Sequence, residues 1–239
     1  MSCSVSGLSC GEDNLVTKAY RALQEVYPKL GAVSVHLTKR VPMGAGLGGG
    51  SANAAAMLLG LKKLFALPIS ISRLAKLSAK LGADIPFFIH NYNQAIGLGI
   101  GDVLKPRLSR VKIWFVLMAS DKGLSTPEVY RNLPKPLPRA VLTKVSRAVT
   151  MTCDFLQRRD LARLSQVMHN DLELSAIRLR PSLQTDMNQM HQLGAQVVRM
   201  SGSGPTLFAI FAQSQAARSF AKRLREIQPR KKIIVCHTY

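Results

Sequence analysis

The sequence predicts an α+β protein built from two domains. Amphipathic helical segments alternate irregularly with short strands and hairpins, which is typical of that class rather than of a doubly wound sheet. The chain has 239 residues, of which 47% are apolar, enough to bury one large core or two small ones. The stretch KPRLSR at 105–110 is polar and carries a proline. We therefore expect one domain over 1–108 and a second over 109–239.

The first half begins with a helix and a strand. Apolar residues recur at three- and four-residue spacing in 13–30, which predicts an amphipathic helix. Asp13 or Asn14 can cap its start, and Gly31 can stop it. Residues 32–38 (AVSVHLT) alternate between apolar and polar, the pattern of a half-buried strand.

A glycine-dense segment and two further helices follow. Residues 42–51 (PMGAGLGGGS) contain too much glycine for regular structure. The next predicted helix covers 51–66 and has Ser51 as a possible cap. Another covers 70–81, where Gly82 ends it. The rest of this half consists of Asp84-Ile85-Pro86, the apolar stretch Phe87 to Ile89, and a glycine-containing turn within 95–104.

The second half opens on a strand. Residues 111–119 (VKIWFVLMA) form a short β-branched and aromatic run, which predicts a buried strand. The proline-rich region 121–139 is predicted to be a loop. The remaining predicted elements are helices at 140–170 and 183–193, strands at 195–200 and 206–212 around the turn 201–205, a helix at 214–226 and a strand at 232–236.

Composition narrows the classes of function. Lys and Arg number 33 against 13 Asp and Glu, so the formal net charge is +20. Such a charge favours an anionic partner, but it does not separate nucleic acid, a membrane surface and a phosphorylated metabolite. No apolar run reaches the roughly 18–20 residues of a membrane span, and residues 1–12 lack a secretory signal. The four cysteines and five histidines show neither a disulfide framework nor metal-ligand spacing. We expect a soluble cytoplasmic protein with no metal site of its own.

The glycine segment carries the clearest chemical signal. Gly44 to Ser51 lies between a predicted strand and a helix, where glycine lets the backbone approach a ligand and the helix start adds free N–H groups. This arrangement predicts a phosphate cradle, with a flexible glycine turn as the alternative. Gly44, Gly46 and Gly49 match the dinucleotide fingerprint, but no acidic residue follows about 20 positions later. No Gly-Lys-Ser/Thr ends the segment, so it is not a Walker A loop.

Five segments resemble the GHMP kinases. Residues 42–55 (PMGAGLGGGSANAA) resemble the second motif of that family, with glycines at 49 and 50 where most members have serines. The triple glycine before Ser51 and Asn53 is similar to the branch that acts on a cytidine-diphosphate-linked methylerythritol. The other four segments, in the order of the family, are 12–15 (EDNL), 81–88 (LGADIPFF), 170–173 (NDLE) and 200–208 (MSGSGPTLF).

The resemblance implies a fold and an ATP site. The implied fold is a mixed α/β N-terminal domain with the glycine loop, followed by a ferredoxin-like C-terminal sandwich. ATP and Mg²⁺ are the implied cofactors. The implied ATP-binding residues are Pro42, Met43, Gly44, Ala45, Gly46, Leu47, Gly48, Gly49, Gly50, Ser51 and Ala52, with Asn14 and Lys39 near the adenine. From the residues alone, Asn14 is also a helix cap and Lys39 a surface lysine. Ser51 can meet phosphate or Mg²⁺, or cap its helix.

The resemblance also assigns acceptor-side residues. In the family, the aspartate that matches Asp84 receives the proton of the attacking hydroxyl or orients it. A helix cap before Pro86 is the alternative. Thr126 and Tyr130 match positions that line the cytidine pocket, where an aromatic ring stacks on a base; the alternative for Tyr130 is packing on its own domain. The turn 201–205 resembles the third motif, which supports the phosphate loop, and its alternative is a plain hairpin turn.

The implied reaction is phosphorylation of the 2-hydroxyl of the cytidine-diphosphate-linked methylerythritol in non-mevalonate isoprenoid biosynthesis. The first strand of the family, which bears a lysine and an asparagine at the active site, has no counterpart here, and residues 1–4 resemble an internal strand. We therefore expect an unpaired sheet edge and weak or no activity for residues 1–239 alone. The alternatives are another GHMP small-molecule kinase or a basic nucleic-acid-binding protein. The nucleic-acid-binding alternative is disfavoured, because the chain has only 6% aromatic residues and contains no RNA-recognition, KH or zinc-finger pattern. No specific nucleic acid or membrane partner is expected.

Overall fold

The chain folds into two compact units. The computed structural model describes residues 1–107, 109–120, 122–133 and 139–238, with the side chains of 139–146 outside the description. Internal contacts group Met1–Met43 with Gly48–Leu108 in unit 1, and Gly44–Leu47 with Ser109–Tyr239 in unit 2. Part of the glycine loop therefore belongs to unit 2, although the sequence placed the whole loop in the first domain.

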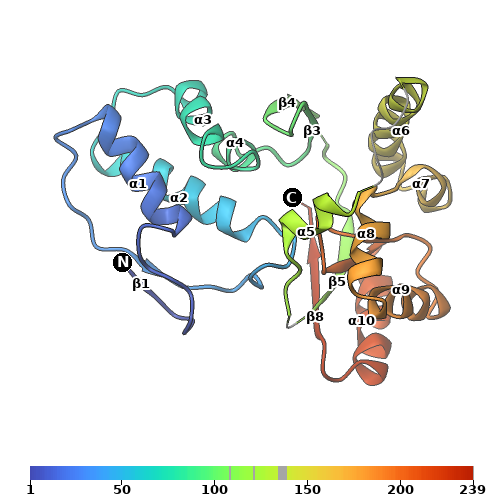
Figure 1. Cartoon of the computed structure of the whole chain (residues 1–239). Helices are drawn as coiled ribbons and strands as arrows, with labels where there is room; N and C mark the ends of the chain where they lie inside the picture. Colours follow the sequence, from blue (N-terminus) through green and yellow to red (C-terminus); the bar gives the residue numbers. More distant parts are fainter. Residues whose placement is uncertain (108, 121, 134–138, 239) are drawn as a thin grey trace. The chain divides into compact units, whose positions relative to one another are not determined.

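Unit 1 is mainly helical, with two small two-stranded sheets (Figure 1). Strands β1 and β2 pair in parallel, and β3 and β4 form an antiparallel hairpin. The elements are β1 Ser2–Cys3, α1 Leu15–Val26, β2 His36–Leu37, α2 Gly49–Leu64, α3 Ile71–Ala79, α4 Ile85–Ile89, β3 Ala95–Leu98 and β4 Val103–Pro106.

The four helices of unit 1 enclose one apolar core. Each contributes a side chain with no solvent exposure, namely Leu23, Leu58, Leu74 and Ile85. Burying side chains of this size stabilises the folded state by about 1.5–3 kcal/mol each. The core therefore fixes the starts of α2 and α4, which carry residues of the candidate site.

Helix starts in unit 1 follow local capping chemistry. Asn14 is the N-cap of α1, where its Oδ1 accepts a hydrogen bond from the Val16 N–H at 2.9 Å, so the expected cap is confirmed. Ser70 caps α3 in the same way. The expected end of the first helix at Gly31 is wrong, because α1 stops at Val26. Pro28 disfavours helical geometry at the residue before it, which explains the early stop.

Three further expectations for unit 1 need correction. Helix α2 begins at Gly49 with Gly48 as its N-cap, so Ser51 lies in the first turn and does not cap the helix. The strand expected over 32–38 pairs only at His36–Leu37. The turn expected within 95–104 is the tip of a β-hairpin whose strands extend to Pro106.

Unit 2 is a four-stranded antiparallel sheet with helices. The strand order is β6-β7-β5-β8, so sequence neighbours β6 and β7 form a hairpin and β5 lies in the interior of the sheet. The elements are β5 Trp114–Ala119, α5 Thr126–Arg131, α6 Arg139–Arg158, α7 Leu161–Val167, α8 Leu172–Leu179, α9 Ser182–Gln192, β6 Val198–Met200, β7 Leu207–Phe211, α10 Ser214–Ile227 and β8 Lys232–His237.

Both faces of this sheet carry apolar clusters. One cluster gathers side chains of β5 and β7 with those of α8, α9 and α10, and it includes Val116, Met190 and Phe220. A smaller cluster contains Leu164 of α7 and Ile210 of β7. Alternation along each strand sends successive side chains to opposite faces, so both clusters draw on the same strands.

Two helices of unit 2 were not expected from the sequence. Helix α5 lies inside the region 121–139 that was predicted to be a loop; residues 121 and 134–138 of that region lie outside the described residues. Helix α8 occupies 172–179, after the long predicted helix, which is itself divided into α6 and α7. In the part of the chain that the structure describes, every helix is too short or too polar to span a bilayer.

We predict that Phe220→Ala destabilises unit 2. The Phe220 ring is 1% exposed and lies 5.0 Å from the ring of Phe211, centroid to centroid. Its removal leaves a cavity in the larger cluster, so the free energy of unfolding should fall by about 3–5 kcal/mol in urea titrations. The neighbouring exposed Ser219→Ala provides the control and should change it by less than about 0.5 kcal/mol. Equal effects of the two variants would contradict the assigned core.

Candidate active site

The glycine loop turns through three left-handed residues. Gly44, Gly46 and Gly48 have φ values of +59°, +71° and +63°. Backbone of this kind is open to glycine and strained for other residues. At Gly46 a Cβ would also lie 2.1 Å from the carbonyl oxygen of Ser201. Glycine is therefore required at 46 both by conformation and by space.

The turn that follows β6 packs directly on this loop within unit 2. The Ser201 hydroxyl donates a hydrogen bond to the Gly46 carbonyl at 2.8 Å. Ala45 is only 2% exposed beside it. The turn also closes the β6–β7 hairpin, since the Ser201 N–H bonds to the Thr206 carbonyl at 2.9 Å. The turn therefore closes a hairpin and also packs on the glycine loop.

The segment 170–173 holds the turn in place. The Asn170 Nδ2 donates to the carbonyls of Met200 and Gly202 at 2.9 and 2.8 Å. Glu173 Oε1 accepts a hydrogen bond from the Met200 N–H at 2.8 Å. Burial raises the pKa of Glu173, while the Met200 N–H and the nearby Arg199 act in the opposite direction. Three segments that are far apart in the sequence thus form one connected arrangement.

The start of α2 is the second part of the loop, and it lies in unit 1. Gly48 supplies no side-chain cap, and the first N–H groups of a helix have no intrahelical acceptor. Lys39 Nζ lies 3.3 Å from where a Cβ on Gly49 would be. A cation beside the positive end of a helix is unfavourable unless an anion is present. This arrangement suits a phosphate group.

Side chains from two other family segments, 12–15 and 81–88, lie beside the same glycines. Leu15, the first residue of α1 after the Asn14 cap, lies 3.3 Å from where a Cβ on Gly50 would be. The Asn14 side chain is occupied, because it caps α1 and its Nδ2 donates to the Ser9 carbonyl at 2.6 Å. The Phe88 ring of α4 lies 3.1 Å from where a Cβ on Gly48 would be.

Asp84 occupies the N-cap position of α4, one turn before Phe88. Its side chain is exposed and, within the described residues, makes no capping hydrogen bond. Pro86 is in the first turn and has no N–H to donate, so one of the two usual donors to a cap is missing. The Asp84 carboxylate is therefore at a helix start without serving as its cap.

Thr126 and Tyr130 belong to unit 2, on α5. Thr126 Oγ1 and Ser203 Oγ lie 2.8 Å apart, which connects α5 to the turn after β6. Tyr130 is 56% exposed, so its ring does not pack into the core of its own unit. An exposed ring on a short helix is available to stack on a base.

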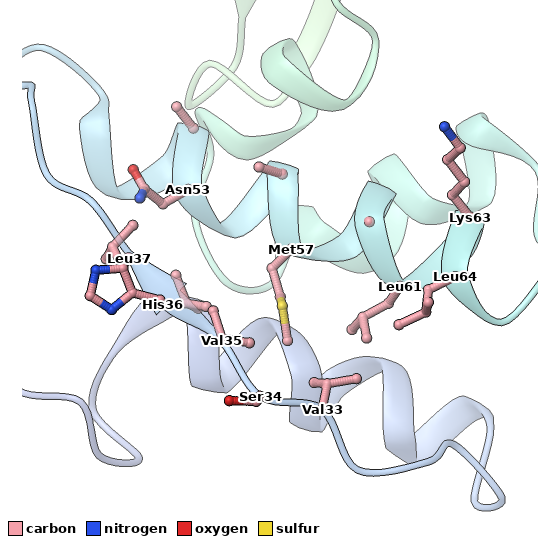
Figure 2. A pocket seen from close by; sticks show the side chains of 14 residues that line it. Val33, Ser34, Val35, His36, Leu37, Asn53, Met57, Leu61, Lys63 and Leu64 are labelled. Atoms are coloured by element: carbon pink, nitrogen blue, oxygen red, sulfur yellow. The ribbon is translucent and has the colours of Figure 1, made fainter. Parts of the chain in front are cut away.

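A cavity lined mainly by apolar side chains lies elsewhere on α2, in unit 1. Figure 2 shows it, with a volume of about 900 Å³, between the segment 33–37 and one face of α2. Val35 of the segment and Met57 of α2 both line the cavity. Ala52 is the one lining residue that was also predicted to belong to the ATP site. Its lining does not suit a triphosphate. Among the described residues, no group of three His, Cys, Asp or Glu side chains is placed to hold a metal ion.

Comparison with known families agrees with this arrangement. The sequence profile of the GHMP kinases N-terminal domain matches residues 14–92, and that of the GHMP kinases C-terminal domain matches 154–229. The chain therefore belongs to the GHMP kinases, a family of ATP-dependent small-molecule kinases. The two-domain α+β fold implied by the resemblance is confirmed.

Individual relatives point to one branch. The 4-diphosphocytidyl-2-C-methyl-D-erythritol kinase of Syntrophus aciditrophicus is 39% identical over 208 residues, which cover 87% of this chain and 71% of the relative. The protein of that name from Arthrobacter sp. strain FB24 is 38% identical and covers 89% and 67%. The chain thus spans about two thirds of these relatives.

Solved structures show the same likeness. A crystal structure of 4-(cytidine 5'-diphospho)-2C-methyl-D-erythritol kinase matches with a TM-score of 0.78 and 32% identity, covering 99% of this chain and 81% of that one. Homoserine kinase from Cytophaga hutchinsonii matches with a TM-score of 0.79 at 18% identity, covering 100% and 81%. The second comparison shows a shared fold alone.

Gly46→Ala should weaken both the fold and nucleotide binding. The added Cβ meets the Ser201 carbonyl, so the loop must move. The matched control is Gly194→Ala, also in unit 2, where φ is +95° and no atom lies within 4 Å of the added Cβ. The control should lose about 1–2 kcal/mol through backbone strain alone, and Gly46→Ala should lose more. Urea titration and ATP calorimetry test this; normal ATP affinity in Gly46→Ala would refute it.

Glu173→Gln should remove a pH-dependent penalty. Because burial raises the pKa of Glu173, the folded protein binds its proton more tightly than the unfolded chain does. The free energy of unfolding of the native protein should therefore fall as pH rises through 4.5 and above. The glutamine retains an acceptor for the Met200 N–H but never ionises. Relative to the native protein, the variant should gain stability with rising pH in urea titrations.

The exposed Glu128→Gln on α5 is the control for Glu173→Gln. It makes the same chemical change at the surface and should track the native protein within about 0.5 kcal/mol. A Glu173→Gln variant that loses stability relative to the native protein as pH rises would show that the ionised carboxylate stabilises the turn.

Proposed function

We propose that the chain transfers the γ-phosphoryl group of ATP to the 2-hydroxyl of 4-diphosphocytidyl-2-C-methyl-D-erythritol, the compound in the names of its relatives. The observation that carries an ATP site is the Lys39 ammonium beside the uncapped start of α2. The resemblance to the relatives carries the acceptor. A cytoplasmic reaction in isoprenoid biosynthesis, and domains over 1–108 and 109–239, belong to the same proposal.

The residues of the glycine loop would bind the phosphates. Free N–H groups at the start of α2 and the positive helix end favour phosphate oxygens. The resemblance implies that Lys39 lies near the adenine, but its position beside Gly49 leads us to assign its charge to the phosphates instead. Phosphoryl transfer depends mainly on positioning and charge neutralisation. Ser51, in the first turn of α2, is the residue whose oxygen would help to hold Mg²⁺, and the ion would supply further neutralisation of phosphate charge. We keep Asn14 as a proposed neighbour of the adenine, although its side chain caps α1 and its backbone N–H and carbonyl are bonded to the Gly11 carbonyl and the Lys18 N–H.

Asp84 would receive or orient the proton of the acceptor hydroxyl. A general base must have its carboxylate free to meet a substrate proton. Asp84 satisfies this, since it is exposed and makes no capping bond. Thr126 and Tyr130 would hold the cytidine, with the exposed ring stacking on the base.

A panel of acceptors tests the function. The chain, Mg²⁺ and ATP are incubated with 4-diphosphocytidyl-2-C-methyl-D-erythritol, homoserine or mevalonate, and ADP release and the phosphorylated product are measured. Acceptor-dependent turnover with the first compound alone supports the proposal. Turnover with another alcohol assigns a different GHMP kinase. Binding to nucleic acid that weakens steeply with salt, without any turnover, would favour the basic-protein alternative.

Asp84→Asn should abolish most of the transfer while leaving the fold intact. The amide cannot accept the hydroxyl proton, and general-base catalysis contributes about 10²–10⁴-fold, so kcat should fall by that factor. The control is Asp102→Asn in the exposed turn between β3 and β4, which should retain native kcat. Native turnover by a folded Asp84→Asn variant would exclude Asp84 as the base.

A further inference from the structure

The Arg180 side chain makes three hydrogen bonds, and Arg180 has no part in the function proposed above. Arg180 is the C-cap residue of α8 and is half-buried. Its Nη1 donates to the Ser120 hydroxyl at 3.1 Å and to the Lys122 carbonyl at 2.7 Å. Its Nη2 donates to the Gly123 carbonyl at 2.9 Å. One guanidinium thus binds the segment that leaves β5 at three points.

This segment leads to two parts of the candidate site within unit 2. It continues directly into α5, where Thr126 and Tyr130 lie. Gly123 also packs on the glycine loop, because a Cβ on Gly123 would lie 3.0 Å from the Gly44 carbonyl oxygen. Thr126 in turn reaches Ser203 of the turn after β6. The backbone held by Arg180 is therefore in contact with the loop and adjacent to the helix.

We infer that Arg180 is a positioning residue for the acceptor side of the site, an inference that rests on the proposed function. Arg180 acts through the Ser120 hydroxyl and the carbonyls of Lys122 and Gly123, so we assign it a positioning role and no part in the chemical step. A planar guanidinium suits this role, because its donors lie in a fixed fork and the hydrogen bonds are charge-assisted. Loss of the fork frees the segment, so α5 samples orientations in which Thr126 and Tyr130 do not meet the cytidine together.

The test compares three variants with the native chain. Arg180→Met removes the fork and keeps the apolar stem, and Arg180→Lys keeps the charge but not the planar geometry. Arg178→Met is the matched control, since Arg178 is exposed on the same helix and loses the same charge. We expect Arg180→Met to raise the KM for the acceptor at least tenfold with a smaller change in kcat, Arg180→Lys to be intermediate, and Arg178→Met to stay within twofold.

A merely structural role predicts a different pattern. Partial unfolding would lower kcat in proportion to the folded fraction and leave KM unchanged. Amide hydrogen exchange adds a readout that needs no substrate: Arg180→Met should speed exchange in the segment 122–130, and Arg178→Met should not. If Arg180→Met fails to fold, Arg180→Lys carries both measurements.

The outcomes separate this inference from the proposed function. Failure of the native chain to phosphorylate the acceptor would refute the function, and hydrogen exchange and CDP affinity by calorimetry would still decide the role of Arg180. Faster exchange at 122–130 with weaker CDP binding supports the inference. The inference is overturned if Arg180→Met shows unchanged amide exchange at 122–130, or if this variant keeps the native KM for the acceptor.

Discussion

The part of the candidate site that lies in unit 2 depends on one constraint, which is the close approach of Gly46 to the Ser201 carbonyl. A contact that excludes even a methyl group must be held by other bonds, because two backbones gain little from bare contact. The Ser201 hydroxyl supplies one such bond on the loop side. Asn170 and Glu173 supply others on the far side of the turn. The family segments at 42–55, 170–173 and 200–208 therefore depend on one another physically.

Unit 1 contributes an electrostatic arrangement that is unfavourable without a ligand. Lys39 lies at the positive end of α2, where a carboxylate would be more stable. A destabilising charge of this kind is typical of a site in which affinity for an anion outweighs stability. This site accounts for only a small part of the net charge of +20. A phosphate needs a few local donors, so most of the excess positive charge has no role in this site.

The sequence predicted best what is decided locally. Asn14 caps α1, as expected, through a bond to a residue two positions away, and such a pattern is visible in a short window. The start of α2 was misjudged because a left-handed Gly48 takes the cap position that Ser51 was expected to fill. Helix α5 was hidden by prolines, although Pro127 in its first turn is compatible with a helix.

Long-range contacts were beyond the reach of sequence patterns. The Ser201–Gly46 hydrogen bond joins residues 155 positions apart, and Arg180 reaches back 57 to 60 positions. No local periodicity signals either pairing. The sequence pattern relates Gly46 to phosphate binding. In the structure, the space that a side chain at this position would need is occupied by the Ser201 carbonyl. The role of Gly46 in unit 2 is to admit the turn, which a motif alone does not reveal.

The two residues at predicted helix starts, Asn14 and Asp84, show how the same position can have opposite chemical roles. Asn14 accepts from the N–H of Val16, so its side chain is committed to the fold. At α4 the corresponding donor is absent, because Pro86 has no N–H. The Ile85 N–H is already bonded to the Gly82 carbonyl at 3.2 Å. Pro86 therefore lowers the need for a cap and leaves the Asp84 carboxylate available for the hydroxyl of a substrate.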